Sequence, residues 1–300
     1  MTFTARTRHG KVLPLRERLR RYARATAAPR TAEGFRSEWT TAAGYRMHAR
    51  VSTSTAPRPT TSLPVSAEAP SPEAPVAVLV HGLAVSHRYF MPTAALLREH
   101  FDVRVVDLPG FGLSDHPDHV LSIQEHSQAL AAWMDNNQIS AAILIGNSFG
   151  CQVLVDLVAR SPYLCSALIL SGPTINSRAR TARKQVGAWL QDTLHEDPLQ
   201  VPMLLRDFRD AGPRRVWATL RIALSDPIED KLPKLAVPTL VLRGEREPIV
   251  TQWWANQVAH LIPGAELRVV PASPHNSVYA AADALVALVL SFLGRVPAGK

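Results

Sequence analysis

The sequence predicts an α/β protein with a mostly parallel sheet, helices on both faces of the sheet, and an inserted helical cap. Apolar runs alternate with segments of helical spacing from residue 76 onwards. Strands that are apolar at every position are typical of parallel sheets covered on both sides. About 60 residues of helix-like sequence, 173–232, interrupt this alternation, which indicates an insertion over one end of the sheet.

The elements are expected in the following order. Residues 45–51 alternate between apolar and polar side chains, which predicts a half-buried strand, and residues 37–40 are expected to pair with it. Apolar runs predict buried strands at 76–82, 103–108, 141–147, 164–172, 237–244 and 265–271. Helical spacing predicts helices at 92–101, 121–136, 149–160, 251–261 and 279–294, and cap helices at 183–194, 201–211 and 214–224.

The domain prediction places the core at residues 36–172 and 233–300 and the cap at 173–232. Within the core, residues 53–75 hold six prolines among Ser, Thr and Ala, which predicts a loop. Residues 1–35 are predicted to be a basic extension, since the first 30 residues carry the whole net charge of +8. We interpret this extension as a terminus with a solvated basic face. The alternative is an amphipathic helix for an anionic membrane surface or an acidic partner.

Several classes of protein are disfavoured by composition. The two cysteines, Cys151 and Cys165, lie in apolar contexts without a CxxC motif, which fits a reducing compartment. Apolar runs stay below the ~18 residues of a membrane span, and no secretory apolar segment follows the basic start. We therefore expect a cytoplasmic protein. Metal-ligand clusters and phosphate loops are not evident, so no metal, cofactor or nucleic-acid partner is expected, and the oligomeric state is left open.

The stretch GNSFG, residues 146–150, lies between a predicted strand and a predicted helix. This is the G-x-S-x-G pattern of a nucleophile elbow in its required context. Ser148 would occupy a sharp turn that raises its hydroxyl above the edge of the sheet. Glycines at 146 and 150 would allow the neighbouring backbones to come close. The pattern therefore predicts Ser148 as a nucleophile.

With this motif in place, the chain resembles the α/β-hydrolase family over roughly residues 37–295. His81-Gly82-Leu83 is similar to the family's oxyanion loop, and DLPGFGLSD at 107–115 is similar to its next conserved turn. His275, in PASPHNS after the last predicted strand, matches the family's catalytic histidine. The resemblance implies that Ser148 attacks an acyl carbonyl and that His275 moves the proton. It also implies that the backbone N–H groups of Leu83 and Phe149 hold the oxyanion.

The acid of the triad departs from the family pattern. The family usually has aspartate at G-x-x-D, where this chain has Gly244-Glu245-Arg246-Glu247. The family's second location for the acid, after the strand ending at residue 172, offers no carboxylate here. Glu247 is therefore the candidate acid, and glutamate serves in this role in some hydrolases. Glu245 is expected to pair with Arg246 or to face solvent.

The function predicted is a serine hydrolase that cleaves a carboxylic ester, or a lactone or thioester, through an acyl-enzyme on Ser148. The alternatives are a C–C bond hydrolase of dienoic diketones, or a non-catalytic ligand-binding homologue. Phe90, Trp189 and Trp217 are predicted to contact an apolar acyl substrate. A basic cluster opens the cap and is interpreted as a solvated face. Its alternative role is recognition of a carboxylate or an acidic carrier protein; the cluster comprises Arg178, Arg180, Arg183 and Lys184.

Overall fold

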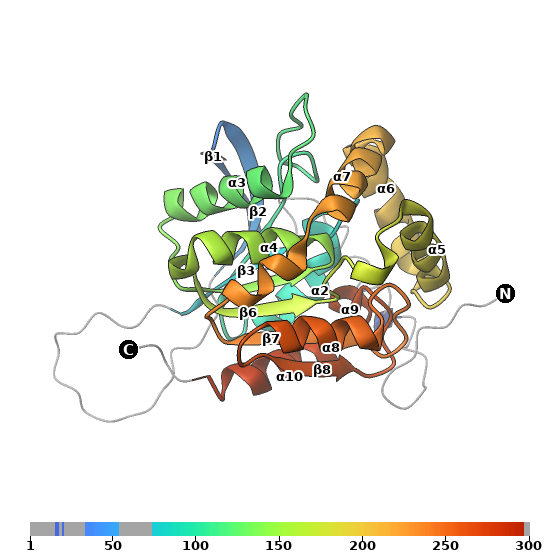
Figure 1. The fold of residues 1–300 in the computed structure, drawn as a ribbon. Coiled ribbons are helices and arrows are strands. Elements are labelled where there is room, and N and C mark those ends of the chain that lie inside the picture. The colour runs from blue at the N-terminus through green and yellow to red at the C-terminus, as the bar shows by residue number, and fades with distance from the viewer. Residues whose placement is uncertain (1–15, 18–19, 21–33, 54–73, 297–300) are drawn as a thin grey trace.

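The computed structural model describes residues 34–53 and 74–296, together with residues 16, 17 and 20. Apart from these three residues, the predicted basic helix lies outside the described residues, as does almost all of the predicted Pro-rich loop. Figure 1 shows a single sheet with helices on both sides. Its eight strands are ordered β1-β2-β4-β3-β5-β6-β7-β8. They are β1 (Phe35–Ala42), β2 (Tyr45–Ser52), β3 (Val76–Val80), β4 (Asp102–Val106), β5 (Ala142–Asn147), β6 (Cys165–Ser171), β7 (Thr239–Gly244) and β8 (Glu266–Val270).

One strand near the edge of the sheet, β2, runs against all the others. β1 and β2 form a hairpin, and β2 pairs antiparallel with β4. The hairpin turn consists of Ala43 and Gly44, both with positive φ, as tight two-residue hairpin turns require. From β4 through β3 to β8 every pairing is parallel. The predicted fold class is confirmed.

The sheet has an apolar layer on each face. In β3, Val78 and Val80 point into one core cluster, while Ala77 and Leu79 point into the other. This alternation follows from the two-residue period of a strand and explains why buried strands are apolar throughout. Figure 1 shows α3 and α4 above the sheet and α10 below it. The first layer contains α3 (Ile123–Asn136), α4 (Phe149–Arg160) and α8 (Gln252–Leu261); the second contains α2 (His87–Leu97), α9 (Ser277–Ala280) and α10 (Ala282–Leu293).

The insertion between β6 and β7 is helical, as its spacing predicts. It contains α5 (Ala182–Thr193), α6 (Val201–Ala211) and α7 (Pro213–Ser225). Figure 1 shows these helices grouped at one end of the sheet. None of the helices in the described part of the chain is long and apolar enough to cross a membrane.

Two helices differ from their predicted bounds. α2 begins at His87, five residues before its expected start, and holds Pro92 in its interior. Ser86 caps this helix by accepting a hydrogen bond from the Arg88 N–H. The long C-terminal helix expected at 279–294 is interrupted at Ala281, whose φ of −134° is not helical. For α2, Pro92 suggested a start that is too late. For the C-terminal segment, the unbroken apolar run concealed the break at Ala281.

Candidate active site

Ser148 lies in the turn between β5 and α4, with φ 54° and ψ −119°. Such backbone conformations cost on the order of 1–3 kcal/mol for a residue other than glycine. The glycines on either side allow the turn to form. A Cβ on Gly150 would lie 2.3 Å from the Val80 carbonyl oxygen, and a Cβ on Gly146 would lie 3.0 Å from the backbone of Gly150. The predicted strand–turn–helix context of Ser148 is therefore present.

The oxyanion-hole candidates flank this turn. Phe149 is the first residue of α4, where backbone N–H groups lack partners within the helix. Leu83 follows β3, in a loop held by His81. The His81 Nε2 accepts the Leu108 N–H at 3.0 Å, so its Nδ1–H donates to the Gly82 carbonyl at 2.7 Å. Burial lowers the pKa of His81, which keeps the imidazole neutral for this double role.

His275 and Glu247 form a hydrogen-bonded pair, in which the His275 Nδ1–H donates to Glu247 Oε1. The Glu247 side chain is fully buried. Its carboxylate also accepts the N–H groups of Gly244 and Val250, at 3.0 and 3.2 Å. Arg243 holds the same loop by donating to the Val250 carbonyl at 2.7 Å and to the Glu247 carbonyl at 3.0 Å. Glu247 is thus fixed in position as well as charged.

Glu245 lies outside this pair and is exposed. Its carboxylate accepts the Ala272 N–H at 2.6 Å, which ties the two loops together at the surface. Of the two expected arrangements, exposure to solvent is the one observed, and no ion pair with Arg246 is found among the described residues. Glu245 therefore holds a loop, while Glu247 contacts the histidine.

Gly172, at the end of β6, makes room for the histidine–glutamate pair. A Cβ there would lie 2.9 Å from the His275 ring and 3.2 Å from Glu247 Oε1. Its φ of +59° also disfavours other residues. The space beside Gly172 is thus occupied by the imidazole of His275.

The cap contributes a second carboxyl group near His275. The His275 N–H donates to both oxygens of Asp192, at 3.1 and 3.2 Å. Asp192, near the end of α5, also forms a hydrogen bond with Glu196, which lies in the segment after the helix. Burial and the neighbouring Asp192 raise the pKa of Glu196 to about 8. At neutral pH the pair therefore holds one proton and carries one negative charge.

The pKa of His275 is raised by its acidic neighbours. Burial by itself would lower this pKa, but the charges of Glu247, Asp192 and Glu196 outweigh that effect. A raised pKa stabilises the imidazolium that a general base forms during the reaction. It also means that the neutral base forms only at a pH above the usual range of histidine.

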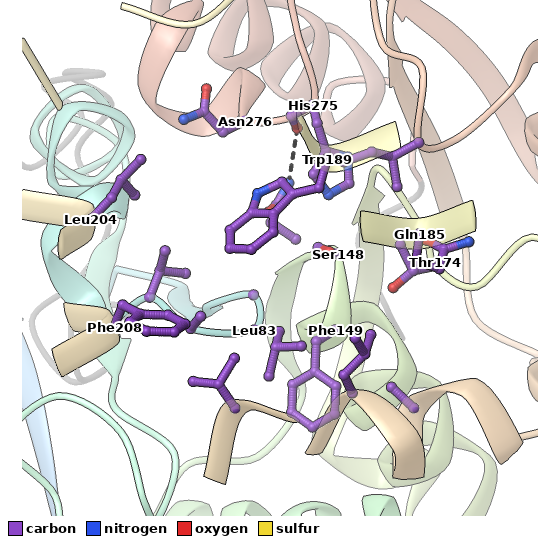
Figure 2. A pocket seen from close by; sticks show the side chains of 18 of the residues that line it. Leu83, Ser148, Phe149, Thr174, Gln185, Trp189, Leu204, Phe208, His275 and Asn276 are labelled. Carbon is purple, nitrogen blue, oxygen red and sulfur yellow. Dashed lines mark hydrogen bonds between the residues drawn. The ribbon is translucent and has the colours of Figure 1, made fainter. Parts of the chain in front are cut away.

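A cavity of about 240 Å³ lies between the core and the cap (Figure 2). Ser148, His275, Leu83 and Phe149 line it together, although they come from three separate segments: the loop after β3, the turn between β5 and α4, and the loop after β8. Ser148 forms no hydrogen bond with His275 in this structure, which describes both residues. Such contacts often stay long until a substrate binds. Most of the other lining side chains are apolar, including Val85, Ile175, Val186, Leu204, Phe208 and Leu220.

The predicted substrate-contacting residues divide into two groups. Trp189 of α5 and Trp217 of α7 line the cavity. Phe90 does not: it is fully buried in the core beneath α2 and is withdrawn as a substrate contact. The preceding residue, Tyr89, lines the cavity instead. Because α2 begins earlier than expected, the orientation of Phe90 could not be derived from the sequence.

Tyr89 and Asn147 connect the oxyanion loop to the histidine loop. The Tyr89 hydroxyl accepts the Gly82 N–H at 3.0 Å and donates to Asn147 Oδ1 at 2.7 Å. The Asn147 amide then donates to the His275 carbonyl at 3.4 Å. Sequence reasoning missed both residues, and the only signal was the polar asparagine before Ser148 in GNSFG. It also missed Asp192 and Glu196, whose four-residue spacing is their signal.

His48, His87 and Asp107 lie close enough together to be considered as metal ligands. Their geometry is that of a hydrogen-bond network. Each histidine Nδ1 lies 2.7–2.8 Å from Asp107 Oδ2, and the carboxylate also accepts the N–H groups of His87 and Leu113. Burial lowers the pKa of His87 to about 4, so this ring is neutral and can donate. The cluster holds the DLPGFGLSD turn in place.

Comparisons with known proteins agree with this geometry. The family model described as the alpha/beta hydrolase family matches residues 77–288. A pimeloyl-[acyl-carrier protein] methyl ester esterase of Vibrio cholerae is 28% identical over 73% of this chain and 94% of its own. An enol-lactonase structure from Burkholderia xenovorans has a TM-score of 0.70 at 22% identity, over 86% of this chain and all of that chain.

A further solved structure, a membrane phospholipase A described as a bacterial virulence factor, has a TM-score of 0.73. It is 17% identical and covers 95% of this chain and 91% of that chain. Likeness at this identity shows the fold alone. The family model covers more than half of the sequence, from β3 into α10, and includes the turn with Ser148. The chain therefore belongs to the alpha/beta hydrolase family.

Proposed function

We propose that this protein is a cofactor-independent serine hydrolase that cleaves a carboxylic ester through an acyl-enzyme on Ser148. One observation carries the proposal: a serine in a strained elbow shares an apolar cavity with a histidine that is hydrogen-bonded to a buried glutamate. This is the set of groups that acyl transfer requires, arranged in the family's chain order. The esterase relative from Vibrio cholerae supports the ester as the bond cleaved.

In the first half of the reaction the Ser148 Oγ attacks the ester carbonyl carbon, and its proton passes to His275 Nε2. The backbone N–H groups of Leu83 and Phe149 bind the oxygen that becomes negative. Each such donor contributes ~2.7–4 kcal/mol in serine proteases. The tetrahedral intermediate collapses, and the leaving alcohol takes the proton from His275.

In the second half a water molecule attacks the acyl-enzyme and gives its proton to His275 Nε2. Collapse of the second intermediate returns this proton to Ser148 and releases the carboxylic acid. Throughout, the Nδ1–H of His275 donates to Glu247, which orients the ring and stabilises its charged form. The two backbone N–H groups on the Glu247 carboxylate keep that partner stationary.

The cavity fits a neutral, apolar acyl group. Its side walls are mainly aliphatic and aromatic, and His275 is the only basic side chain among the described residues that line it. An anionic group inside would therefore have no arginine or lysine partner, and it would face Glu196. Esters of medium-chain, uncharged acids are the proposed substrates, and activated lactones and thioesters could react by the same steps.

A fluorophosphonate probe tests the proposal directly. The wild-type chain should be labelled in a 1:1 ratio, and Ser148→Ala should not be labelled. A burst of p-nitrophenol from p-nitrophenyl butyrate, equal in amount to the protein, should accompany this result. The loss of kcat in Ser148→Ala is expected to be roughly 10⁴–10⁶. Labelling that persists in the variant would remove Ser148 as the nucleophile.

A further inference from the structure

The outer surface of the cap carries most of the exposed large apolar side chains of the described residues. Three such residues are scattered elsewhere on the molecule: Trp39, Tyr163 and Val269. The remaining six lie on or beside α5, α6 and α7, with exposed fractions from 39% to 64%; they are Trp189, Leu190, Leu194, Val201, Leu205 and Trp217. Exposed apolar side chains gathered in one region indicate an interaction surface.

Two of these side chains lie at the candidate active site, and the other four lie on the same group of cap helices or next to it. Trp189 and Trp217 line the cavity and are also 45% and 51% exposed, so each has one side in the cavity and one in solvent. Figure 2 shows Trp189 in the same region of the cavity as Ser148. Leu190 and Leu194 are one turn apart on α5, and Val201 and Leu205 are one turn apart on α6.

The same surface is strongly cationic. Every residue from 178 to 221 is described, and none of the five acidic residues among them is exposed. Arg183, Arg214 and Arg221 have no acidic partner among the described residues. On α7, Arg214 and Arg221 lie three residues before and four residues after Trp217, on the same side of the helix. The exposed basic residues are Arg178, Arg183, Lys184, Arg206, Arg209, Arg214 and Arg221.

We propose that this cap surface, formed by the exposed residues of α5–α7, docks the protein onto an anionic lipid surface. Leucine and tryptophan side chains enter the boundary between headgroups and acyl chains, and the arginines contact the anionic headgroups. Amphiphilic esters held in the lipid then reach Ser148 through the entrance between Trp189 and Trp217. This delivery of substrate rests on the proposed ester hydrolysis, whereas the docking does not.

The side chains favour lipid over an acidic protein partner. Three of the six apolar residues are leucines, which are under-represented among the residues that dominate binding in protein–protein interfaces. Leucine and tryptophan next to Lys and Arg are instead the composition of helices that bind in the plane of a membrane surface. An acidic carrier protein is therefore a competing outcome of the test.

The test is co-sedimentation of the full chain with large unilamellar vesicles in 0.1 M NaCl. Vesicles of phosphatidylcholine with 30% phosphatidylglycerol should bind the protein at least about tenfold more tightly than pure phosphatidylcholine, and 0.5 M NaCl should weaken binding. One variant combines Leu190→Ser, Leu194→Ser and Leu205→Ser, and another combines Arg183→Glu, Arg214→Glu and Arg221→Glu. Neither set lines the cavity. Each should reduce binding to anionic vesicles about tenfold or more.

Two controls keep the outcomes distinct. Tyr163→Ser removes an exposed apolar side chain away from the cap and should leave vesicle binding unchanged. Activity on soluble p-nitrophenyl acetate should stay within about twofold in both triple variants, which shows that the fold and the site are intact. If soluble-ester activity is absent but the vesicle results hold, the proposed function fails and the docking stands.

Three results would overturn the docking proposal. The first is vesicle binding by the triple variants as tight as that of the wild type, which would assign the binding to the basic N-terminal segment that all variants retain. The second is equal binding of the wild type to neutral and anionic vesicles. The third is binding of an acidic acyl carrier protein to the cap surface in a titration in which vesicles do not bind, which would assign the surface to a protein partner.

Discussion

The core loops and the cap hold their functional residues in different ways. In the core, Ser148, His275 and Glu247 are fixed by close backbone approaches and by hydrogen bonds from main-chain groups. In the cap, the residues that line the cavity are large apolar side chains, and two of them are half exposed. The difference indicates that the core determines the chemistry and the cap determines which molecules reach it.

Among the changes that test this comparison of the two regions, the largest effect is expected where the core loses a charge. Glu247→Gln keeps the size of the side chain but removes the negative partner of His275. The matching change in a serine protease costs ~10⁴ in kcat, and we expect a loss of roughly 10²–10⁴. The matched control is Glu245→Gln, which is expected to have little effect because Glu245 contacts only the surface loop.

The pH dependence sharpens the same prediction. His275 acts as a base only when neutral, so kcat/KM should rise as pH increases through its raised pKa. Removal of the Glu247 charge should move that midpoint to lower pH, because one cause of the raised pKa is lost. Full pH profiles of kcat/KM on one ester would show this. A midpoint that does not move, or a larger loss in Glu245→Gln, would contradict the assignment of the acid.

In the cap, the expected effects depend on the substrate. Replacing Trp189 or Trp217 with alanine removes part of the wall that an acyl chain contacts. We expect kcat/KM to fall roughly 5–30-fold for an octanoyl ester, which corresponds to the loss of ~1–2 kcal/mol of apolar contact. An acetyl ester should change within about threefold. Equal losses on both esters would show that the cap takes part in the chemistry, and the comparison between the two regions would fail.

The carboxyl pair of Asp192 and Glu196 lies at the junction of the two regions. It is expected to have a smaller effect, on the pH dependence of the free energy of unfolding. In the unfolded chain Glu196 releases its proton near its ordinary pKa, but in the folded protein it holds the proton up to about pH 8. The folded state therefore binds more protons in this window, and its contribution to stability falls as pH rises toward 8. Glu196→Gln should flatten this slope in urea titrations at pH 5, 6.5 and 8. An unchanged slope would mean that the pair shares no proton.

The smallest effect is expected from the basic N-terminal segment. Deletion of residues 1–30 should leave kcat/KM on a small neutral ester within roughly threefold, because its charge is segregated ahead of the first strand of the sheet. Circular dichroism would confirm that the shortened chain is folded. A large loss in a folded protein would show that the segment completes the cap or the core.

Sequence reasoning predicts most of the fold because its signals are local. Apolar runs and helical spacing identify all six central strands and the three cap helices, and the strand–turn–helix pattern predicts the elbow at Ser148. α2 is placed wrongly because Pro92 suggests a helix start, while the actual start is set by Ser86 and by packing on the sheet. A local preference is overridden there by tertiary contacts.

The contacts among the site residues could be predicted only in part. The family order indicated Ser148, Glu247 and His275 as one group, and the structure brings the last two into contact. The role of Asp192 could not be inferred, because it depends on how the cap lies over the histidine loop, 83 residues further along the chain. The prediction that Phe90 contacts substrate was wrong for the same reason. Phe90 points into the core, whereas its neighbour Tyr89, on another side of α2, lines the cavity.

Gly172 restricts which substitutions this site can accept. A carboxylate carried at the end of β6 would need the space that the His275 ring now fills, while Glu247 would still hold the ring there. Loss of Glu247 first would leave the histidine without its charge. Substitution of Gly172 first would push the ring away from Ser148. The two positions are therefore mutually dependent, because a side chain at Gly172 and the Glu247–His275 pair compete for the same space.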